Sequence, residues 1–216
     1  MSTTTLPTSL LTTLDTLKTV LGISGSTEDD YLNYLIKQAS SQVEGYCTRV
    51  LGRVDYETTV SIFRGDASPS KILLRLYPDV VVTSVKCVDS DGVSMTLDSD
   101  GYLVDDGSGV LTLTSASIAS INAYAADGEF KVITVDHTGA YYLPEDVANR
   151  NLPEAIEAAT IELCKSARYS REQDPSIRSE TVPDVLQVSY FAGGGGSGSH
   201  ETIMSGLDIY RDMRIF

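Results

Sequence analysis

The spacing of apolar residues predicts two helices near the start of the chain. The clearer one follows Thr27, which can cap a first turn, and the acidic run at 28–30 suits the positive end of a helix dipole. Apolar residues then recur every three or four positions along one face: Leu32, Leu35, Ile36, Ala39, Val43, Tyr46 and Cys47. A shorter helix before it is capped at Thr12 or Thr13 and ends at Gly22.

A third helix is predicted from near Pro153, a residue typical of a first helical turn, as far as Pro175. Its buried stripe comprises Ile156, Ala159, Thr160, Leu163, Cys164 and Ala167. Four charged residues are expected to lie mainly outside that stripe: Glu154, Glu157, Glu162 and Arg168.

Between the second and third helices the apolar period changes to two, which indicates strands. Apolar and polar residues alternate over about 54–62, 71–76 and 81–87, and a further strand is predicted at 130–137. Aspartate and glycine turns predict short hairpins at 89–92, 98–101 and 105–109. The predicted fold class is α+β: a small bundle of three main helices packed with an antiparallel β-sheet and hairpins, plus an extended C-terminal arm.

These elements divide the chain into three parts. Residues 1–11 are polar and low in complexity, and form a flexible N-terminal arm. Residues 12–175 form the α+β body, with its β-hairpin region at about 54–137. Residues 176–216 comprise a C-terminal strand, a hinge of glycine and serine, and a tail.

Composition narrows the class of partner. The 216 residues are 42% hydrophobic, which suits one globular domain with extensions. The net charge of -14 argues against an electrostatic grip on nucleic acid. The N-terminal residues lack the basic start and apolar core of a signal peptide, and no apolar run approaches the roughly 20 residues of a membrane span. We therefore expect a soluble chain that is not exported.

The cysteines do not predict a metal site or a disulfide framework. Cys47, Cys87 and Cys164 are odd in number, far apart, and form no CxxC pair. We expect them to be small core residues in a reducing compartment.

The glycine run near the C-terminus is interpreted as a flexible hinge. Its members are Gly193, Gly194, Gly195, Gly196 and Gly198. A P-loop needs Lys and then Ser or Thr after its last glycine, but Ser199 and His200 stand there. The helix and second strand of a dinucleotide fold do not follow either, so no cofactor is predicted.

No catalytic constellation is predicted. Asp136 and His137 are neighbours in a strand and therefore point to opposite faces of the sheet. The aspartate-rich turns could suggest calcium, but an EF-hand loop carries glycine at its sixth position, whereas each DSDG segment carries it at the fourth. We expect no enzyme activity and no metal site.

The tail from 201 to 216 carries several apolar residues behind the hinge. It is too short to form a core of its own. We expect it to bury this face either on another molecule or in a groove of its own domain, where the third helix offers a surface.

Five segments in a fixed order carry a family resemblance: TLDTLKTVLGIS at 13–24, TEDDYLNYLIKQASSQVEGYCTR at 27–49, LRLYPDVVVTSV at 74–85, VDHTGAYYLPEDV at 135–147 and SETVPDVLQVSY at 179–190. In these segments, which span most of 12–190, the chain resembles the head completion adaptors, or head-tail connector proteins, of tailed bacteriophages. The segment at 89–127 is longer than the usual insert of the family, and His137 stands where an aromatic residue is common.

The resemblance implies a structural role in the virion neck, at the interface of head and tail, after assembly in the host cytoplasm. Such adaptors form a ring, usually of twelve copies, beneath the portal protein once the head is filled. They extend the channel, through which DNA passes without sequence-specific binding, and they offer a docking surface to the stopper or tail. Another ring subunit of the neck or tail terminus, or a metal-dependent hydrolase, is the alternative.

The resemblance also assigns a role to the tail, because the C-terminal segment of such adaptors typically reaches the portal. The glycine hinge would let the tail adapt to its site. The residues expected to contact the portal are Ile203, Met204, Leu207, Tyr210, Arg211, Arg214 and Phe216.

Overall fold

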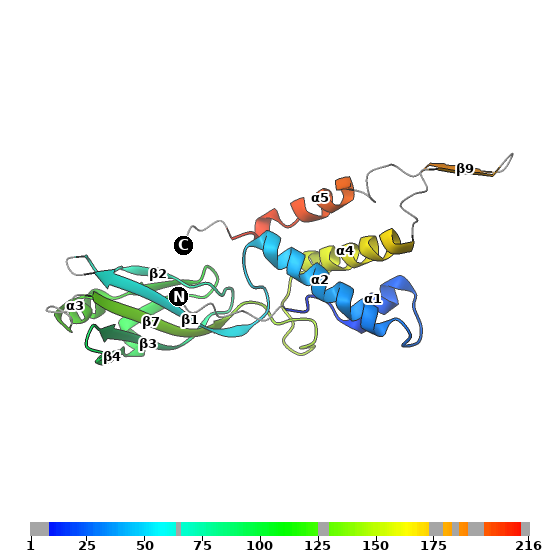
Figure 1. Ribbon diagram of the computed structural model, residues 1–216. Coiled ribbons are helices and arrows are strands. Elements are labelled where there is room, and N and C mark those ends of the chain that lie inside the picture. Colours follow the sequence, from blue (N-terminus) through cyan, green and yellow to red (C-terminus); the bar gives the residue numbers. More distant parts are fainter. Residues whose placement is uncertain are drawn as a thin grey trace. The chain divides into compact units, whose positions relative to one another are not determined.

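The helices and the main sheets fall into two units of the chain in the computed structural model (Figure 1). The structure describes residues 9–63, 66–124, 130–172, 179–182, 186–189 and 197–212. A helical unit comprises Met1–Val50 and Tyr142–Phe216, and a strand unit comprises Leu51–Tyr141. Helices and antiparallel strands occur together, so the predicted α+β class is confirmed. None of the described helices is both long and apolar enough to cross a membrane.

The helical unit is built around two long helices. Its described elements are α1 (Leu14–Leu21), α2 (Asp29–Cys47), α4 (Glu154–Glu172), the hairpin of β8 (Ser179–Val182) and β9 (Leu186–Ser189), α5 (Ser197–Ser205) and the 3-10 turn η2 (Asp208–Tyr210). α2 packs against both α1 and α4, and α5 packs against α4.

The first helix has the ends that the sequence predicts. Thr13 caps α1, because its side-chain oxygen accepts the N–H of Thr16 at 3.1 Å. Gly22 ends the helix in the left-handed conformation, with φ of 67°, which glycine adopts without strain. An ion pair of 2.7 Å between Lys18 and Asp29 ties α1 to the start of α2.

The N-cap of the second helix lies one residue later than predicted, and the helix begins at Asp29. The N-cap is Glu28 rather than Thr27, and it makes no side-chain capping bond. Six of the seven predicted core positions are buried, and the seventh, Tyr46, is half-buried. Beyond Cys47 the chain leaves the helix through Thr48, whose φ is 55°.

The third predicted helix is α4, and two of its residues are placed differently from the prediction. Ala167, expected in the buried stripe, is exposed. Glu157, expected outside, is buried with only 7% of its surface exposed. The carboxylate is accommodated there because Arg150 and Thr12 supply partners for both of its oxygens.

The N-terminal segment packs closer to the body than the sequence indicates. Ser9 and Leu11 are buried, and the backbone N–H of Leu11 donates to the side chain of Ser40 at 3.1 Å. Residues 1–8 of the expected arm lie outside the described residues.

The strand unit contains two antiparallel sheets. Their strands are β1 (Val54–Phe63), β2 (Lys71–Leu73), β3 (Val81–Asp89), β4 (Ser94–Leu97), β5 (Tyr102–Asp105), β6 (Val110–Leu113) and β7 (Phe130–Gly139). The first sheet has the order β1-β7-β3-β4 and the second the order β2-β6-β5. Side chains from both sheets form one core, which includes Ile72, Leu74, Val85, Leu111, Ile133 and Val135.

One helix of the strand unit was not predicted from the sequence. α3 (Ser115–Tyr124) lies in the segment where only hairpins were expected. Thr114 accepts the N–H of Ser117 at 3.3 Å at its start, and Ile121 is fully buried. Only two positions of α3 are buried, so its sequence carries little helical periodicity.

Two aspartates of the predicted turns accept hydrogen bonds within those turns. One oxygen of Asp89 accepts the N–H groups of Asp91 and Val93, at 3.0 and 2.9 Å. Asp105 accepts the hydroxyl of Ser108 at 2.6 Å. Within the described ranges, no three His, Cys, Asp or Glu side chains are grouped so that they could hold a metal ion.

Candidate interaction surface

The described part of the tail lies on its own helical unit. Met204 and Leu207 are buried, with 6% and 1% of their surfaces exposed. α5 runs back beside α4 (Figure 1). The two alternatives that the sequence left open for the tail were another molecule and a groove of its own domain, and the structure shows the tail in the second arrangement.

Backbone groups join the tail to the end of α2. The N–H of Asp212 donates to the carbonyl of Cys47 at 2.9 Å. The hydroxyl of Thr48 lies 2.7 Å from the carbonyl of Asp212 and 2.7 Å from that of Cys47, and its one hydrogen can serve either acceptor. The last carbonyls of a helix have no partner within the helix. The tail therefore supplies a backbone donor to the last carbonyl of α2.

The side chain of Tyr46 adds two polar contacts to the same surface. Its hydroxyl donates to Asp208 at 2.5 Å, and the guanidinium of Arg211 lies 5.5 Å from the centre of its ring. The hydrogen bond to Asp208 raises the pKa of the Tyr46 hydroxyl above its ordinary value, and desolvation adds to the rise. We use the term tail-binding surface for Tyr46, Cys47 and Thr48 together with the part of α4 that α5 contacts.

The structure places some of the predicted tail residues and not others. Ile203 and Tyr210 are half-buried, and Arg211 is exposed apart from its contact with Tyr46. Arg214 and Phe216 lie outside the described residues. The contact of these residues with a portal stays a prediction.

The predicted hinge is described at one glycine only. Gly193, Gly194, Gly195 and Gly196 lie outside the described residues. Gly198 lies within α5, so the helical segment anchored by Met204 begins earlier than the sequence indicates.

Sequence reasoning missed several of the polar groups that hold the tail. Tyr46 was assigned to the apolar face of α2, and neither Asp208 nor Asp212 was singled out. The hydroxyl of Tyr46 in the last turn of α2 could have indicated a polar contact there. Nothing in the sequence, however, indicates which distant acid it contacts.

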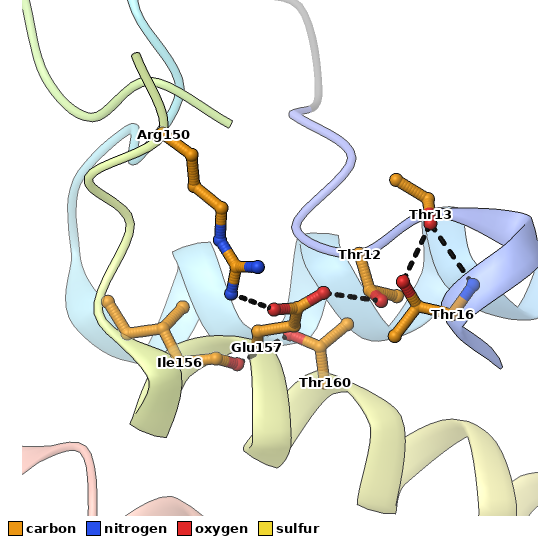
Figure 2. Close-up of polar contacts among 7 residues, drawn as sticks. All are labelled: Thr12, Thr13, Thr16, Arg150, Ile156, Glu157 and Thr160. Carbon is orange, nitrogen blue, oxygen red and sulfur yellow. Dashed lines mark hydrogen bonds and ion pairs between the residues drawn. The ribbon is translucent and has the colours of Figure 1, made fainter. Parts of the chain in front are cut away.

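A second polar cluster joins the segments that precede α1 and α4 (Figure 2). The hydroxyl of Thr12 donates to one oxygen of Glu157 at 3.0 Å, and Arg150 forms an ion pair with the other. Glu157 thus connects the segment before α1 with the segment before α4. Thr160 meanwhile satisfies a carbonyl within α4, donating to Ile156 at 2.9 Å.

The structure confirms that Asp136 and His137 face opposite sides of their sheet. Asp136 accepts the hydroxyl of Ser84 at 2.6 Å and pairs with Lys86 at 3.2 Å, and these contacts lower its pKa. His137 is buried beside Tyr56, and this burial lowers its pKa. The two side chains cannot act as a catalytic pair.

The three cysteines are buried free thiols, as the sequence predicts. Burial raises the pKa of Cys47 to about 11 and that of Cys164 to about 12. Burial also raises the pKa of Cys87. Since the thiolate is the reactive form, these groups are poor nucleophiles at neutral pH.

Comparison with known proteins identifies two kinds of likeness. Residues 11–78 match the family model described as phage gp6-like head-tail connector protein. No curated protein matches the chain. The fold is similar to that of a chain in the neck of an empty gene transfer agent (GTA) particle computed with C6 symmetry, with 14% identity and a TM-score of 0.55 over 95% of this chain and 92% of that chain.

A chain in the virion of a native GTA particle is similar to the same degree, with 15% identity and a TM-score of 0.55 over 100% of this chain and 96% of that one. At these identities the likeness shows a shared fold. The resemblance to head-tail connector proteins is confirmed by the family match at 11–78, which covers α1, α2, β1 and β2.

Proposed function

We propose that this chain is a structural subunit of a virion neck, and specifically a head-tail connector that assembles as a ring. The observation that carries the proposal is the match of residues 11–78 to the head-tail connector family. The shared fold with a neck chain over 95% of this chain supports it. The role requires no catalytic step, and the buried thiols and separated Asp136 and His137 suit a structural subunit.

In this proposal the ring lies beneath the portal after the head is filled, and it extends the DNA channel toward the stopper or tail. Copies in a ring meet through heterologous interfaces, in which one side of each subunit contacts the opposite side of the next. Twelve copies are the expected number. The net charge of -14 favours a channel wall that DNA passes without being held.

The surface that the tail keeps exposed is the part that can contact the portal while the tail is docked. In the described part of the tail this surface includes Arg211 and the uncovered sides of the half-buried Ile203 and Tyr210, and Arg214 and Phe216 follow them in sequence. Met204 and Leu207 cannot contribute unless the tail leaves the tail-binding surface, because both are already buried.

Electron microscopy of the purified protein mixed with DNA-filled, tailless heads of its own phage tests the proposal. We expect a ring of added density beneath the portal. The Leu207→Asp variant, which displaces the tail, should bind less, whereas Val147→Asp introduces the same charge at a position that is 88% exposed and should bind normally. Binding to isolated tail tubes instead of heads would move the subunit to a tail-terminal ring, and binding to neither would contradict the proposal.

A further inference from the structure

The connection between α4 and α5 is much longer than its place in the helical unit requires. Helices that lie side by side in a bundle are joined by roughly 2–8 residues. Here α5 runs back beside α4 (Figure 1), yet 24 residues, from 173 to 196, separate Glu172 from Ser197. That length is available for reaching a site other than the one on the same chain.

An adjoining copy lies within this reach. Twenty-four extended residues span at most about 80 Å. If the β8–β9 hairpin stays folded, 13 residues remain outside it, and a chain of 13 residues can span at most about 43 Å. The centres of adjacent folded chains of this size are on the order of 40 Å apart.

The structure itself displays one surface that fits this tail. Tyr46 receives Asp208 and Arg211, the carbonyl of Cys47 receives the N–H of Asp212, and Leu207 is fully covered. Every other copy of the chain carries an identical surface. A second copy is therefore the partner whose fit to the tail needs no new contact.

We propose that the tail is exchanged between copies: in the assembled ring, the segment 197–212 of each subunit occupies the tail-binding surface of the next subunit. This inference rests on the ring of the proposed function. Every contact that is broken within a chain is formed again between chains. The exchange therefore changes which subunit supplies the tail, while the hydrogen bonds and apolar contacts stay the same. Passed around a closed ring, it links all the subunits.

Local concentration decides when the exchange occurs. Within one chain the linker holds the tail at an effective concentration on the order of millimolar. A dilute subunit therefore keeps its own tail, as in the structure. Once neighbours are fixed side by side, the next subunit's surface also lies within reach of the linker, and exchange adds the stability of a linked ring.

Chemical cross-linking distinguishes a tail held within a chain from a tail held between chains. The double variant Thr48→Cys, Asp212→Cys places two thiols at positions that are close together, because the Thr48 hydroxyl lies 2.7 Å from the Asp212 carbonyl and the Asp212 N–H is bonded to the preceding residue, Cys47. The native cysteines are buried. A short bismaleimide will therefore react mainly at the introduced pair, and a denaturing gel will separate single chains from covalent multimers.

We expect the dilute protein to run as a cross-linked single chain, and the head-bound protein and a concentrated solution near millimolar to give a ladder of multimers. A variant that carries only one of the two introduced cysteines should give no ladder, and adding Leu207→Asp to the double variant should abolish cross-linking in all samples. Single chains alone in both the concentrated and the head-bound samples would overturn the exchange. If the protein fails to bind heads, the proposed function fails, and the concentrated sample still decides whether tails are exchanged.

Discussion

The hydroxyl of Tyr46 donates a 2.5 Å hydrogen bond to the carboxylate of Asp208, which lies 162 positions later in the chain. The same ring lies under the guanidinium of Arg211. One side chain in the last turn of α2 therefore contacts an acid and a base of the tail. Its hydroxyl is the part of the tail-binding surface that can be removed without changing the shape of that surface.

The Tyr46→Phe variant is expected to loosen the tail, because it removes the hydrogen bond to Asp208 and keeps the ring. The backbone N–H of Asp212, which is bonded to Cys47, should exchange with deuterium several-fold faster. Tyr34→Phe, a change on the same helix at a position that is 61% exposed, should leave this rate unaltered. Equal exchange rates in the wild type and the Tyr46 variant would contradict the role of the hydroxyl.

The same bond should give the tail a dependence on alkaline pH. The pKa of Tyr46 is raised by Asp208, so the stabilising contribution is complete below the ordinary tyrosine pKa and is lost as the pH rises through the raised value. Ionisation removes the donor and places a negative charge beside Asp208. Protection of the Asp212 amide should fall in that range in the wild type, after correction for the intrinsic exchange rate, with no matching step in Tyr46→Phe.

The carboxylate of Glu157 is expected to stabilise the helical unit through its buried contacts. Glu157→Gln keeps an acceptor for Thr12 but loses the ion pair with Arg150, at a cost of about 1–3 kcal/mol. We place the value below that of a fully buried pair because 38% of the Arg150 side chain is exposed and can be hydrated. The melting temperature should fall by roughly 2–4 °C per kcal/mol, as measured by thermal unfolding.

Glu162→Gln is the matched control on the same helix. Glu162 pairs with Lys165 at 2.6 Å, but half of its side chain is exposed. Exposed pairs contribute about 0–1 kcal/mol, so this change should be nearly neutral. If the two variants lose equal amounts of unfolding free energy, the burial of Glu157 does not increase its contribution to stability.

The sequence predicts the main helices of this protein better than the contacts between side chains that are distant in the chain. The caps at Thr13 and Gly22 were sufficient for α1, and the long apolar faces of α2 and α4 were sufficient for those two helices. α3 was missed because it buries only two residues and its segment was assigned to hairpins from its turn signals.

The burial of Glu157 and the partners of Tyr46 depend on residues about 145 and 162 positions away. Neither pairing leaves a local pattern. The position of the tail was therefore left between two alternatives until the structure was known.

Two glycines should respond in opposite ways to the same substitution. A Cβ at Gly139 would lie 2.8 Å from the carbonyl oxygen of Leu76, which is backbone and cannot turn aside, so Gly139→Ala should destabilise by about 1–3 kcal/mol. A Cβ at Gly45 in α2 would meet nothing within 4 Å, and Gly45→Ala should stabilise by roughly 0.5–1 kcal/mol. Denaturant titrations measure both. If Gly139→Ala leaves the free energy of unfolding unchanged, the backbone at Leu76, in the segment between β2 and β3, can shift to make room.

His137 should make the strand unit sensitive to acid. Its Nε2 is buried without a hydrogen-bond partner, and Nδ1 lies 3.2 Å from the carbonyl of Val135. Burial lowers the pKa of the imidazole below its ordinary value of 6.5. Stability is therefore complete above pH 6.5 and is lost as the pH falls toward the depressed pKa, since the unfolded chain binds the proton more readily.

Replacing His137 with Gln should remove this step, so the stability of the variant should change less between pH 7 and pH 5 than that of the wild type. Asp136 on the opposite face does not interfere, because its lowered pKa places its titration below 3.8. His200→Gln, at the only other histidine of the chain, should retain the step. Denaturant midpoints at the two pH values measure the difference, and an unchanged midpoint in the wild type would mean that the protonated ring finds a partner inside the fold.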